Sequence, residues 1–402
     1  MRHMKAYPTY LLMKGVSALA MSFFYTISTL YLVKIVGLDP LQVLLLSTCV
    51  EATVFLCEIP TGIVADVYSR KVSVVIGMAL LGSAFALEGT MPYFAVIAVA
   101  RVIWGVGYTF ISGAEAAWIA DELGEEKMKI VYLRGSQIGQ LGGLLGIGLS
   151  VVVASFGLAF PLITGGAILA CLAVVLALLM PEDHFSPTPK AGRSTWQSMV
   201  DTLHMGLKEI TFKRAVGVLL IIRLFYGFFG EGVDLLWQIH TLSVFPEAAA
   251  TSITTWVGAI SATTMVLQVG VIQFLTGRLA KSDERAVGGL LVWVNVALIL
   301  ATLCFALAGN FVVAVASYLS LSLARSVNRP LQTAWLNRGM PSQVRATVLS
   351  ISEQVLSLGA IVGGPLLGLI ARYSVPVALL FAASVLVPVP FLYALARKRS
   401  VL

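Results

Sequence analysis

The feature that most constrains this chain is a series of long apolar segments separated by short polar connections. A helix that crosses the hydrocarbon core of a bilayer needs about 20 mostly apolar residues. Because the backbone must satisfy its own hydrogen bonds in lipid, and no barrel-like alternation is present, each segment is predicted to be a helix. The sequence therefore predicts an all-α integral membrane protein. The twelve predicted spans are residues 9–36, 41–63, 72–90, 93–119, 131–155, 158–180, 214–240, 252–275, 286–307, 310–336, 346–371 and 375–396.

The composition supports a lipid environment. Of the 402 residues, 58% are hydrophobic and 12% are charged, whereas soluble domains contain about 25% charged residues. The formal net charge of +7 does not indicate nucleic-acid binding, because Lys and Arg gather in the short gaps between apolar runs. Cytoplasmic loops carry such an excess of positive charge. We therefore expect a multi-pass protein of the inner (plasma) membrane with both termini in the cytoplasm.

A long polar stretch, residues 181–213, divides the predicted spans into two sets of six. It begins with Pro and Ser and then shows helical periodicity that includes Trp196 and Leu203. This pattern predicts a cytoplasmic linker that contains an amphipathic helix on the membrane surface. We expect residues 1–180 to form one six-helix bundle and residues 214–402 to form the other.

The two halves resemble each other in sequence. In an ungapped alignment Ala117-Trp118 falls on Ala334-Trp335, and further matches follow in the same order at corresponding helices. Such internal duplication is how many transporters are built. It predicts two bundles related by a pseudo-twofold axis, a 6+6 arrangement.

The sequence gives no sign of a metal site, a cofactor or an enzyme. The four cysteines lie in apolar segments without a CxxC motif or clustered His, so we expect them to be small core residues. The glycine-rich stretch GQLGGLLGIG in span five has no following Lys-Ser/Thr, so it is predicted to pack helices rather than to bind a nucleotide. No catalytic constellation of side chains is evident once the spans are placed.

The connection between the second and third spans reads TGIVADVYSRK, which concentrates charge in a very short gap. It resembles the loop signature of the major facilitator superfamily, although Ser69 stands where the family usually has Gly. The matching residues are Gly62, Asp66, Arg70 and Lys71. A second family signature, R-x-x-x-G-x-G in span four, is matched by Arg101, Gly105 and Gly107.

This resemblance implies a role for the loop in the transport cycle. Asp66 is expected to lie against the N-terminal end of span eleven, around residues 345–347, where the helix dipole favours an anion. Arg70 is expected to pair with an acid at the inner end of span four, for which Asp121 is the candidate. Together with Gly62 and Lys71, these residues would form a latch that joins the two halves when the cytoplasmic side is closed.

The stretches EIPTGIVAD and SGAEAAWIAD look most like bacterial drug/proton antiporters, of the multidrug or macrolide efflux type. The Gly-Pro pair of such antiporters is missing from span five, where Gln140 follows Gly139. The resemblance implies alternating access and export of an amphipathic small organic molecule, for which cations are one candidate class, with a proton gradient as the energy source. Two alternatives of the same fold stay open: a proton-coupled importer of a small metabolite and a lipid or lysolipid flippase. We expect a monomer.

Charged residues inside the spans are candidates for proton coupling, because each costs about 2.5–3.5 kcal/mol at mid-bilayer. Glu231 and Asp234 are one helical turn apart in span seven, and Arg325 in span ten is the expected compensating charge. Two neighbouring carboxylates in a low-dielectric site favour a proton on one of them. Glu51 is the second choice, and it lies at a depth where it can pair with Arg101 or shape the cavity. The alternative is an outer-end pair solvated by an extracellular vestibule.

Further charges lie toward the cytoplasmic ends of the spans. We expect an inner network of Glu58, Arg134 and Glu115, and a matching pair of Arg329 with Glu353, either as gates or as packing ion pairs. In the resembling family, spans one, four, seven and ten line the central cavity. Aromatic residues of these spans are therefore expected either to meet substrate or to pack against lipid. The cavity candidates are Tyr25, Tyr108, Tyr226 and Trp237.

Overall fold

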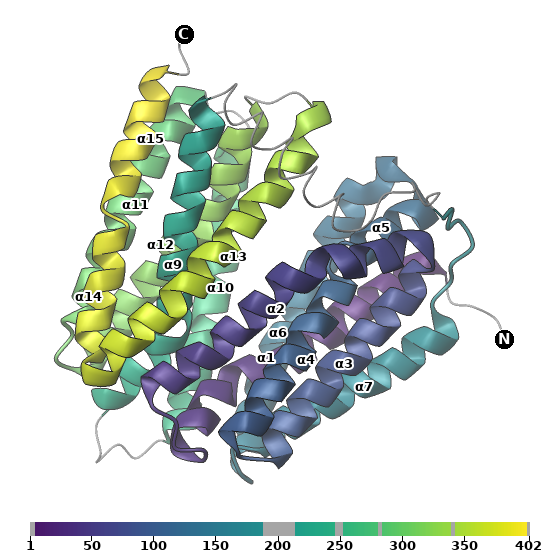
Figure 1. The fold of residues 1–402 in the computed structure, drawn as a ribbon, viewed down its shortest axis with the longest axis horizontal. Coiled ribbons are helices and arrows are strands. Elements are labelled where there is room, and N and C mark those ends of the chain that lie inside the picture. Colours follow the sequence, from purple (N-terminus) through teal and green to yellow (C-terminus); the bar gives the residue numbers. More distant parts are fainter. Residues whose placement is uncertain (1–4, 188–213, 246–251, 280–283, 339–341, 400–402) are drawn as a thin grey trace. The chain divides into compact units, whose positions relative to one another are not determined.

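A computed structural model describes residues 5–187, 214–245, 252–279, 284–338 and 342–399 (Figure 1). All regular elements in these ranges are helices. They are α1 (Ala6–Lys34), α2 (Pro40–Val67), α3 (Arg70–Thr90), α4 (Phe94–Ile111), α5 (Ala114–Leu123), η1 (Glu125–Lys127), α6 (Met128–Ala154), α7 (Phe160–Leu179), α9 (Arg214–Ser243), α10 (Ile253–Leu279), α11 (Glu284–Ala306), α12 (Phe311–Arg338), α13 (Ser342–Tyr373), α14 (Val375–Val385) and α15 (Pro388–Arg399).

Eleven segments of the described chain are long and apolar enough to cross a membrane. Three of them combine consecutive helical elements: α4 with α5, η1 with α6, and α14 with α15. The helix α9 has 30 residues, also enough to span, and three of its charges, Arg223, Glu231 and Asp234, lower the hydropathy of its described part. With α9 the described chain has twelve segments long enough to span a membrane, and the predicted all-α membrane fold is confirmed.

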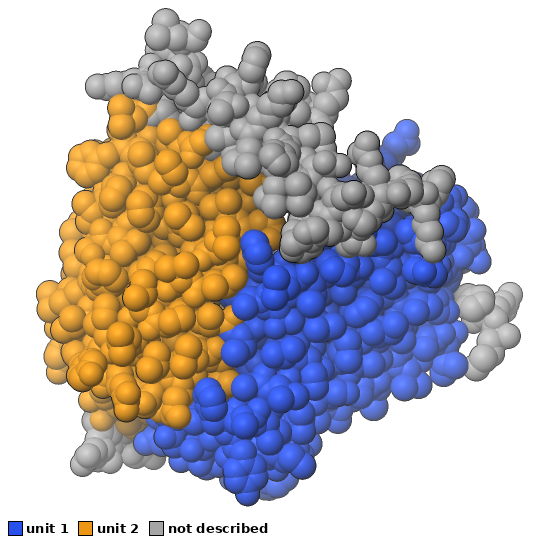
Figure 2. Space-filling view, viewed as in Figure 1, with its two compact units in different colours: residues 1–38, 49–199 blue, residues 39–48, 200–402 orange. Residues whose placement is uncertain are grey.

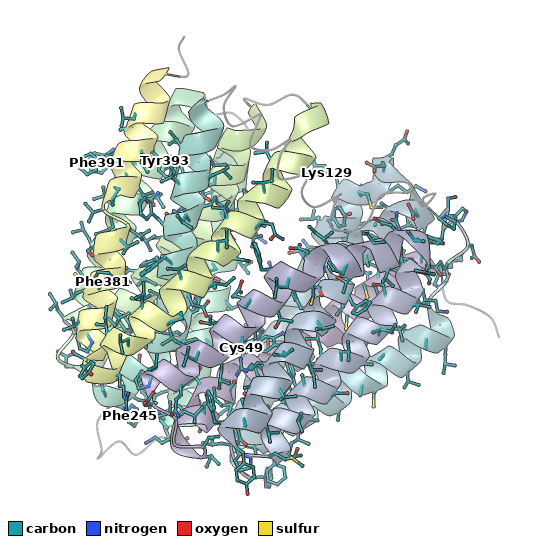
Figure 3. All side chains as sticks on the ribbon, in the orientation of Figure 1. Cys49, Lys129, Phe245, Phe381, Phe391 and Tyr393 are labelled. Atoms are coloured by element: carbon teal, nitrogen blue, oxygen red, sulfur yellow. The ribbon has the colours of Figure 1, made fainter. Side chains whose placement is uncertain are left out.

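The outward faces of these helices are apolar, as lipid requires. On α15, Phe391 is 66% exposed and projects away from the helices in Figure 3, whereas Tyr393 is 1% exposed. The two residues are two positions apart, which places them on opposite faces of one helix. The same helix therefore presents a lipid-facing side and a packed side.

The chain forms two compact units, coloured separately in Figure 2. Unit 1 comprises residues 1–38 and 49–199, and unit 2 comprises residues 39–48 and 200–402. The predicted bundle limits stay a prediction. The amphipathic helix predicted in the linker falls on residues 188–213, which lie outside the described residues.

Small residues allow close helix packing in each unit. In unit 1 a Cβ atom on Gly82 of α3 would lie 2.7 Å from the carbonyl oxygen of Gly166 on α7. In unit 2 Gly227 of α9 faces the backbone of Leu356 on α13 in the same way. Because lipid supplies no hydrophobic force between helices, such close approach is what stabilises their association.

Candidate functional site

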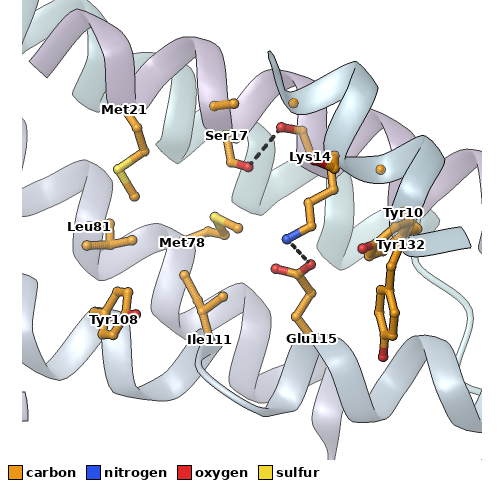
Figure 4. A pocket seen from close by; sticks show the side chains of 14 residues that line it. Tyr10, Lys14, Ser17, Met21, Met78, Leu81, Tyr108, Ile111, Glu115 and Tyr132 are labelled. Atoms are coloured by element: carbon orange, nitrogen blue, oxygen red, sulfur yellow. Dashed lines mark hydrogen bonds and ion pairs between the residues drawn. The ribbon is translucent and has the colours of Figure 1, made fainter. Parts of the chain in front are cut away.

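Unit 1 contains an open pocket of about 510 Å³ that is lined by residues of α1, α3, α4, α5 and α6 (Figure 4). This volume falls within the range of about 300–1,000 Å³ that is typical of small-molecule sites. The residues that line it are Tyr10, Lys14, Ser17, Ala18, Met21, Met78, Leu81, Tyr108, Ile111, Glu115, Tyr132, Gly135, Ser136 and Gly139.

An ion pair lies in the middle of this pocket. The Nζ atom of Lys14 is 2.5 Å from Oε1 of Glu115, and the two side chains are 34% and 16% exposed. The helix α4 ends at Ile111, and Gly113, with φ of 77°, is the N-cap residue of α5, so Glu115 falls in the first turn of α5. A carboxylate is favoured there because the helix dipole is positive at the N-terminus. The N-terminus of α5 thus stabilises the negative charge of Glu115 independently of Lys14.

Apolar and sulfur-containing side chains form one end of the pocket. Met21, Met78, Leu81 and Tyr108 lie together to one side of the ion pair in Figure 4. Thioether side chains are flexible and polarizable, so they adapt to ligands of different shape. This part of the pocket is suited to an apolar group and can accommodate apolar groups of different shapes.

Aromatic rings form the other end of the pocket. Tyr10 and Tyr132 meet edge to face with ring centroids 6.4 Å apart, and Lys14 Nζ lies 5.7 Å from the Tyr10 centroid. Tyr10 is 2% exposed, and a Cβ atom on Gly135 would lie 2.9 Å from the Tyr10 hydroxyl oxygen. Its ring is therefore fixed by packing and presents an electron-rich face to a cation.

The structure assigns Glu115 a different partner from the expected inner network. Lys14 of α1 pairs with Glu115, while Arg134 donates a hydrogen bond of 3.3 Å to Gln137 on its own helix. Lys14 lies inside the first predicted span, residues 9–36. The sequence does not predict that Lys14 pairs with Glu115, because the two residues meet only through the packing of α1 against α5. Glu58 lies on α2 and is half-buried.

A second charged cluster is fully buried in unit 1. Arg101 of α4 donates to Glu88 Oε1 at 2.8 Å and to Ser28 Oγ at 3.0 Å, and the Tyr31 hydroxyl donates to the Glu88 carbonyl oxygen at 2.9 Å. The side chains of Arg101 and Glu88 are 6% and 1% exposed. This ion pair of Arg101 is with Glu88, a residue that sequence reasoning missed; a pair with Glu51 was one of the two alternatives that the sequence left open for Glu51.

Aromatic rings surround the Arg101 guanidinium. It lies 4.8 Å from the Trp104 ring centroid and 5.1 Å from that of Phe24. Tyr25 touches Trp104 edge to face at 5.6 Å and is 56% exposed. The predicted cavity residue Tyr25 therefore packs against Trp104, which in turn contacts the buried Arg101.

In unit 2 Arg325 of α12 and Asp234 of α9 form a bidentate ion pair, with N–O distances of 2.5 and 2.9 Å. The Asp234 side chain is 62% exposed, whereas Glu231 is 8% exposed. Nearby, Trp237 stacks on Tyr318 with centroids 4.3 Å apart, and Tyr226 donates a hydrogen bond to Asn295. The two carboxylates that the sequence placed together therefore have unlike environments.

Glu353 of α13 is shared by two arginines. Arg223 Nη2 lies 2.5 Å from its Oε1 atom, and Arg329 Nη2 lies 3.6 Å from the same atom. The contact with Arg329 is the expected one, and Arg223 is an additional partner from α9. Whether these pairs act as gates stays a prediction.

The loop between α2 and α3 holds the expected Arg70–Asp121 contact, at 2.9 Å. Asp66, near the end of α2, lies 3.9 Å from Arg70 and is 56% exposed, and Gly62 lies one turn earlier on the same helix. The expected neighbours of Asp66, residues 345–347, have side chains outside the described part of the chain. The role of these residues as a latch stays a prediction.

Ser69 takes the place of the usual Gly for a local reason. It is the N-cap of α3 with φ of −174°, an extended conformation open to any residue, and its Oγ atom accepts from the Val72 amide. The Ser69 hydroxyl also donates to Glu182 at 2.7 Å, and the Lys71 amide donates to the same carboxylate at 2.9 Å. Glu182, which sequence reasoning missed, thus joins the start of the linker to the loop.

The same linker segment is anchored to α5. The Trp118 indole donates to the Pro181 carbonyl oxygen at 2.7 Å, and the Glu122 carboxylate accepts from the amides of Asp183 and His184 at 2.8 and 3.0 Å. The pattern of polar and apolar residues at the start of the linker does not predict these contacts.

Twelve helical segments of the described chain that are long enough to span, an amphipathic pocket and ion pairs within the spans together define a multi-pass membrane transporter of small molecules. A profile described as Major Facilitator Superfamily matches residues 10–364. The chain therefore belongs to the major facilitator superfamily, whose members are secondary transporters rather than enzymes.

Two relatives from Bacillus subtilis (strain 168) are similar over most of their length. The uncharacterized MFS-type transporter YxaM is 23% identical over 354 residues, which cover 88% of this chain and 86% of that protein. Multidrug resistance protein 2 is 23% identical over 328 residues, which cover 80% and 78%.

Solved structures share the fold. The nucleoside transporter NupG superposes with a TM-score of 0.79 at 16% identity and covers 98% of this chain and 100% of its own. A bacterial homologue of the human lysosomal transporter Spinster superposes with a TM-score of 0.77 at 14% identity, and the match covers 98% and 96%. At these identities the likeness concerns the fold alone.

Proposed function

We propose that this chain exports amphipathic, cationic small organic molecules in exchange for protons. The observation that carries the proposal is the pocket of unit 1, which combines a carboxylate and electron-rich rings with a methionine-rich apolar end. A molecule with one positive group and an apolar body is complementary to both ends at once. The similarity to multidrug resistance protein 2 supports the same class of substrate.

The chemistry of the lining favours breadth over strict selection. A site that rejects close analogues relies on several directed hydrogen bonds that a wrong ligand leaves unmade. Here the apolar end consists of methionine and other side chains that make no directed hydrogen bonds. Glu115, the one carboxylate of the pocket's described lining, attracts a cation through its charge, and this attraction has no strong angular preference. Such a pocket accepts molecules that share charge and amphipathicity, and this breadth is what multidrug export requires.

Glu231 is our preferred proton carrier. Arg325 neutralises Asp234 through two hydrogen bonds, and Asp234 is largely exposed. Glu231 lies one turn away on α9 and is 8% exposed, so the charged form of Glu231 pays the larger desolvation cost in a membrane bundle. Binding and release of a proton there would change the charge of the bundle during alternating access.

The proposal is tested with purified protein in liposomes and an imposed pH gradient. Accumulation of a fluorescent organic cation should depend on the gradient in wild type and in Cys304→Ala, a control at an exposed α11 cysteine. Glu231→Gln should abolish pH-driven movement and retain exchange of labelled for unlabelled substrate, because exchange needs no net proton transfer. Asp234→Asn should retain pH-driven movement at a reduced rate.

Two results would count against this assignment. If no organic cation moves under either polarity of the gradient, the antiporter proposal is wrong. If Glu231→Gln keeps full pH-driven transport, the proton is carried elsewhere, and Glu51 becomes the next residue to test.

A further inference from the structure

We propose that the Lys14 ammonium group is a tethered competitor of the substrate: it occupies the cation position at Glu115 in the empty pocket and leaves when an amphipathic organic cation binds. This inference rests on the proposed function and defines the ligand class of its pocket. It follows from four features of the described residues.

The first feature is the charge balance of the pocket. Among its described lining residues, Glu115 is the one acid and Lys14 is the one base, and their charged atoms are 2.5 Å apart. An isolated charge in a membrane bundle is costly, so the empty pocket is stable because these two charges neutralise each other. Any ligand cation that reaches Glu115 must therefore replace the one already present.

The second feature is the unequal mobility of the two partners. Glu115 is 16% exposed and sits in the first turn of α5, where the helix dipole stabilises its negative charge. Lys14 is 34% exposed and has a long flexible stem, which lets its ammonium group move toward a wetter position. When the pair opens, the carboxylate keeps its place and the ammonium group leaves. The opened pocket is thus a site for cations.

The third feature is the ring of Tyr10, which already faces a cation. Lys14 Nζ is 5.7 Å from the ring centroid, and Gly135 leaves just enough room for the buried ring. Because packing fixes Tyr10 independently of Lys14, the ring stays available to a ligand cation after Lys14 has moved. Tyr132 extends the same aromatic wall.

The fourth feature is the apolar end of the pocket, which Lys14 does not fill. Met21, Met78 and Leu81 lie to one side of the Lys14–Glu115 ion pair in Figure 4. A ligand gains apolar burial there that Lys14 cannot offer. This difference allows an amphipathic cation to displace Lys14, while a small hydrophilic cation gains nothing over it.

The test measures binding to purified full-length protein in detergent by isothermal titration calorimetry. The two probes are tetraphenylphosphonium and tetraphenylborate, which share size and shape and carry opposite charge. Lys14→Met removes the competitor and keeps an unbranched side chain, Lys14→Arg keeps the positive charge, and Glu115→Gln removes the position for which both compete.

Removal of the competitor should tighten binding of the cation. The apparent affinity of a site that is open for only a fraction of the time is reduced by that fraction. If the pair is closed for about nine-tenths of the time, Lys14→Met should bind tetraphenylphosphonium about tenfold more tightly than wild type. Lys14→Arg should stay close to wild type, and Glu115→Gln should lose most of the affinity. Tetraphenylborate should bind no more tightly to Lys14→Met than to wild type.

Several results would overturn the inference. These are weaker or unchanged binding of tetraphenylphosphonium to Lys14→Met, no binding to it at all, or preferential binding of tetraphenylborate that is lost with Lys14. The last result would mean that Lys14 holds an anionic ligand. Failure of the proposed function is distinguishable, because these affinities can change as expected even if no pH gradient drives transport in liposomes.

Discussion

Removal of one partner of the buried Glu88–Arg101 pair should strongly destabilise unit 1. The two side chains are 1% and 6% exposed and their charged atoms are 2.8 Å apart, so solvent screens the interaction very little. Breaking a buried pair by deleting one member costs about 3–5 kcal/mol, because the remaining charge is left uncompensated. Arg101→Met and Glu88→Gln should each lower the free energy of unfolding by this amount.

The double variant distinguishes charge compensation from lost packing. In Glu88→Gln/Arg101→Met no buried charge is left, so the loss of stability should be well below the sum of the two single losses. The resulting coupling energy should reach about 1–3 kcal/mol, the upper part of the range for residues in contact. The Ser28 hydroxyl, which donates to Glu88 Oε1, and the Tyr31 hydroxyl, which donates to the Glu88 carbonyl oxygen, remain to satisfy polar atoms at position 88.

The assay is reversible unfolding in mixed detergent micelles, followed by tryptophan fluorescence. A matched control is the pair of Asp39 with Arg372, whose closest atoms are 3.4 Å apart and whose side chains are 35% and 58% exposed. Asp39→Asn should cost only about 0.2–1 kcal/mol, as exposed pairs do. Additive losses in the double variant, or single losses as small as in this control, would refute the reasoning.

Two further outcomes are expected. Asp66→Asn should slow transport severalfold and leave substrate affinity nearly unchanged, since the residue belongs to the predicted latch and not to the pocket; a large rise in the dissociation constant would contradict this role. Gly82→Ala should cost about 1–3 kcal/mol of stability, the usual cost of overpacking, because its Cβ atom would lie 2.7 Å from the carbonyl oxygen of Gly166. Gly148→Ala, whose Cβ atom meets nothing within 4 Å among the described residues, should be neutral or slightly stabilising, and equal losses in the two variants would rule out close α3–α7 packing as the cause.

Some ion pairs could be predicted from the sequence. Asp234 and Arg325 were expected together because a charge inside a span needs a compensating charge and a membrane bundle offers few. Arg70 and Asp121 were expected from the family signature. In both cases the residues stand out by their type, since charges are rare in this chain.

Other ion pairs could not be predicted from the sequence. Lys14 and Glu88 both lie inside predicted spans, but nothing in their sequence positions indicates a partner for either of them. Glu182 lies in a polar stretch where acidic residues carry no signal. In each case several partners were equally compatible with the sequence, and the choice depends on how helices are rotated about their axes.

The sequence by itself determined the number and order of the spans and the class of protein, because lipid excludes every spanning structure except apolar helices and closed barrels. Tertiary structure alone decided which faces of those helices meet. A rotation of one helix by a single residue, about 100° from 3.6 residues per turn, preserves the hydropathy of a span and exchanges all its neighbours. The pairing of Lys14 with Glu115, and with it the chemistry of the pocket, is set at that level.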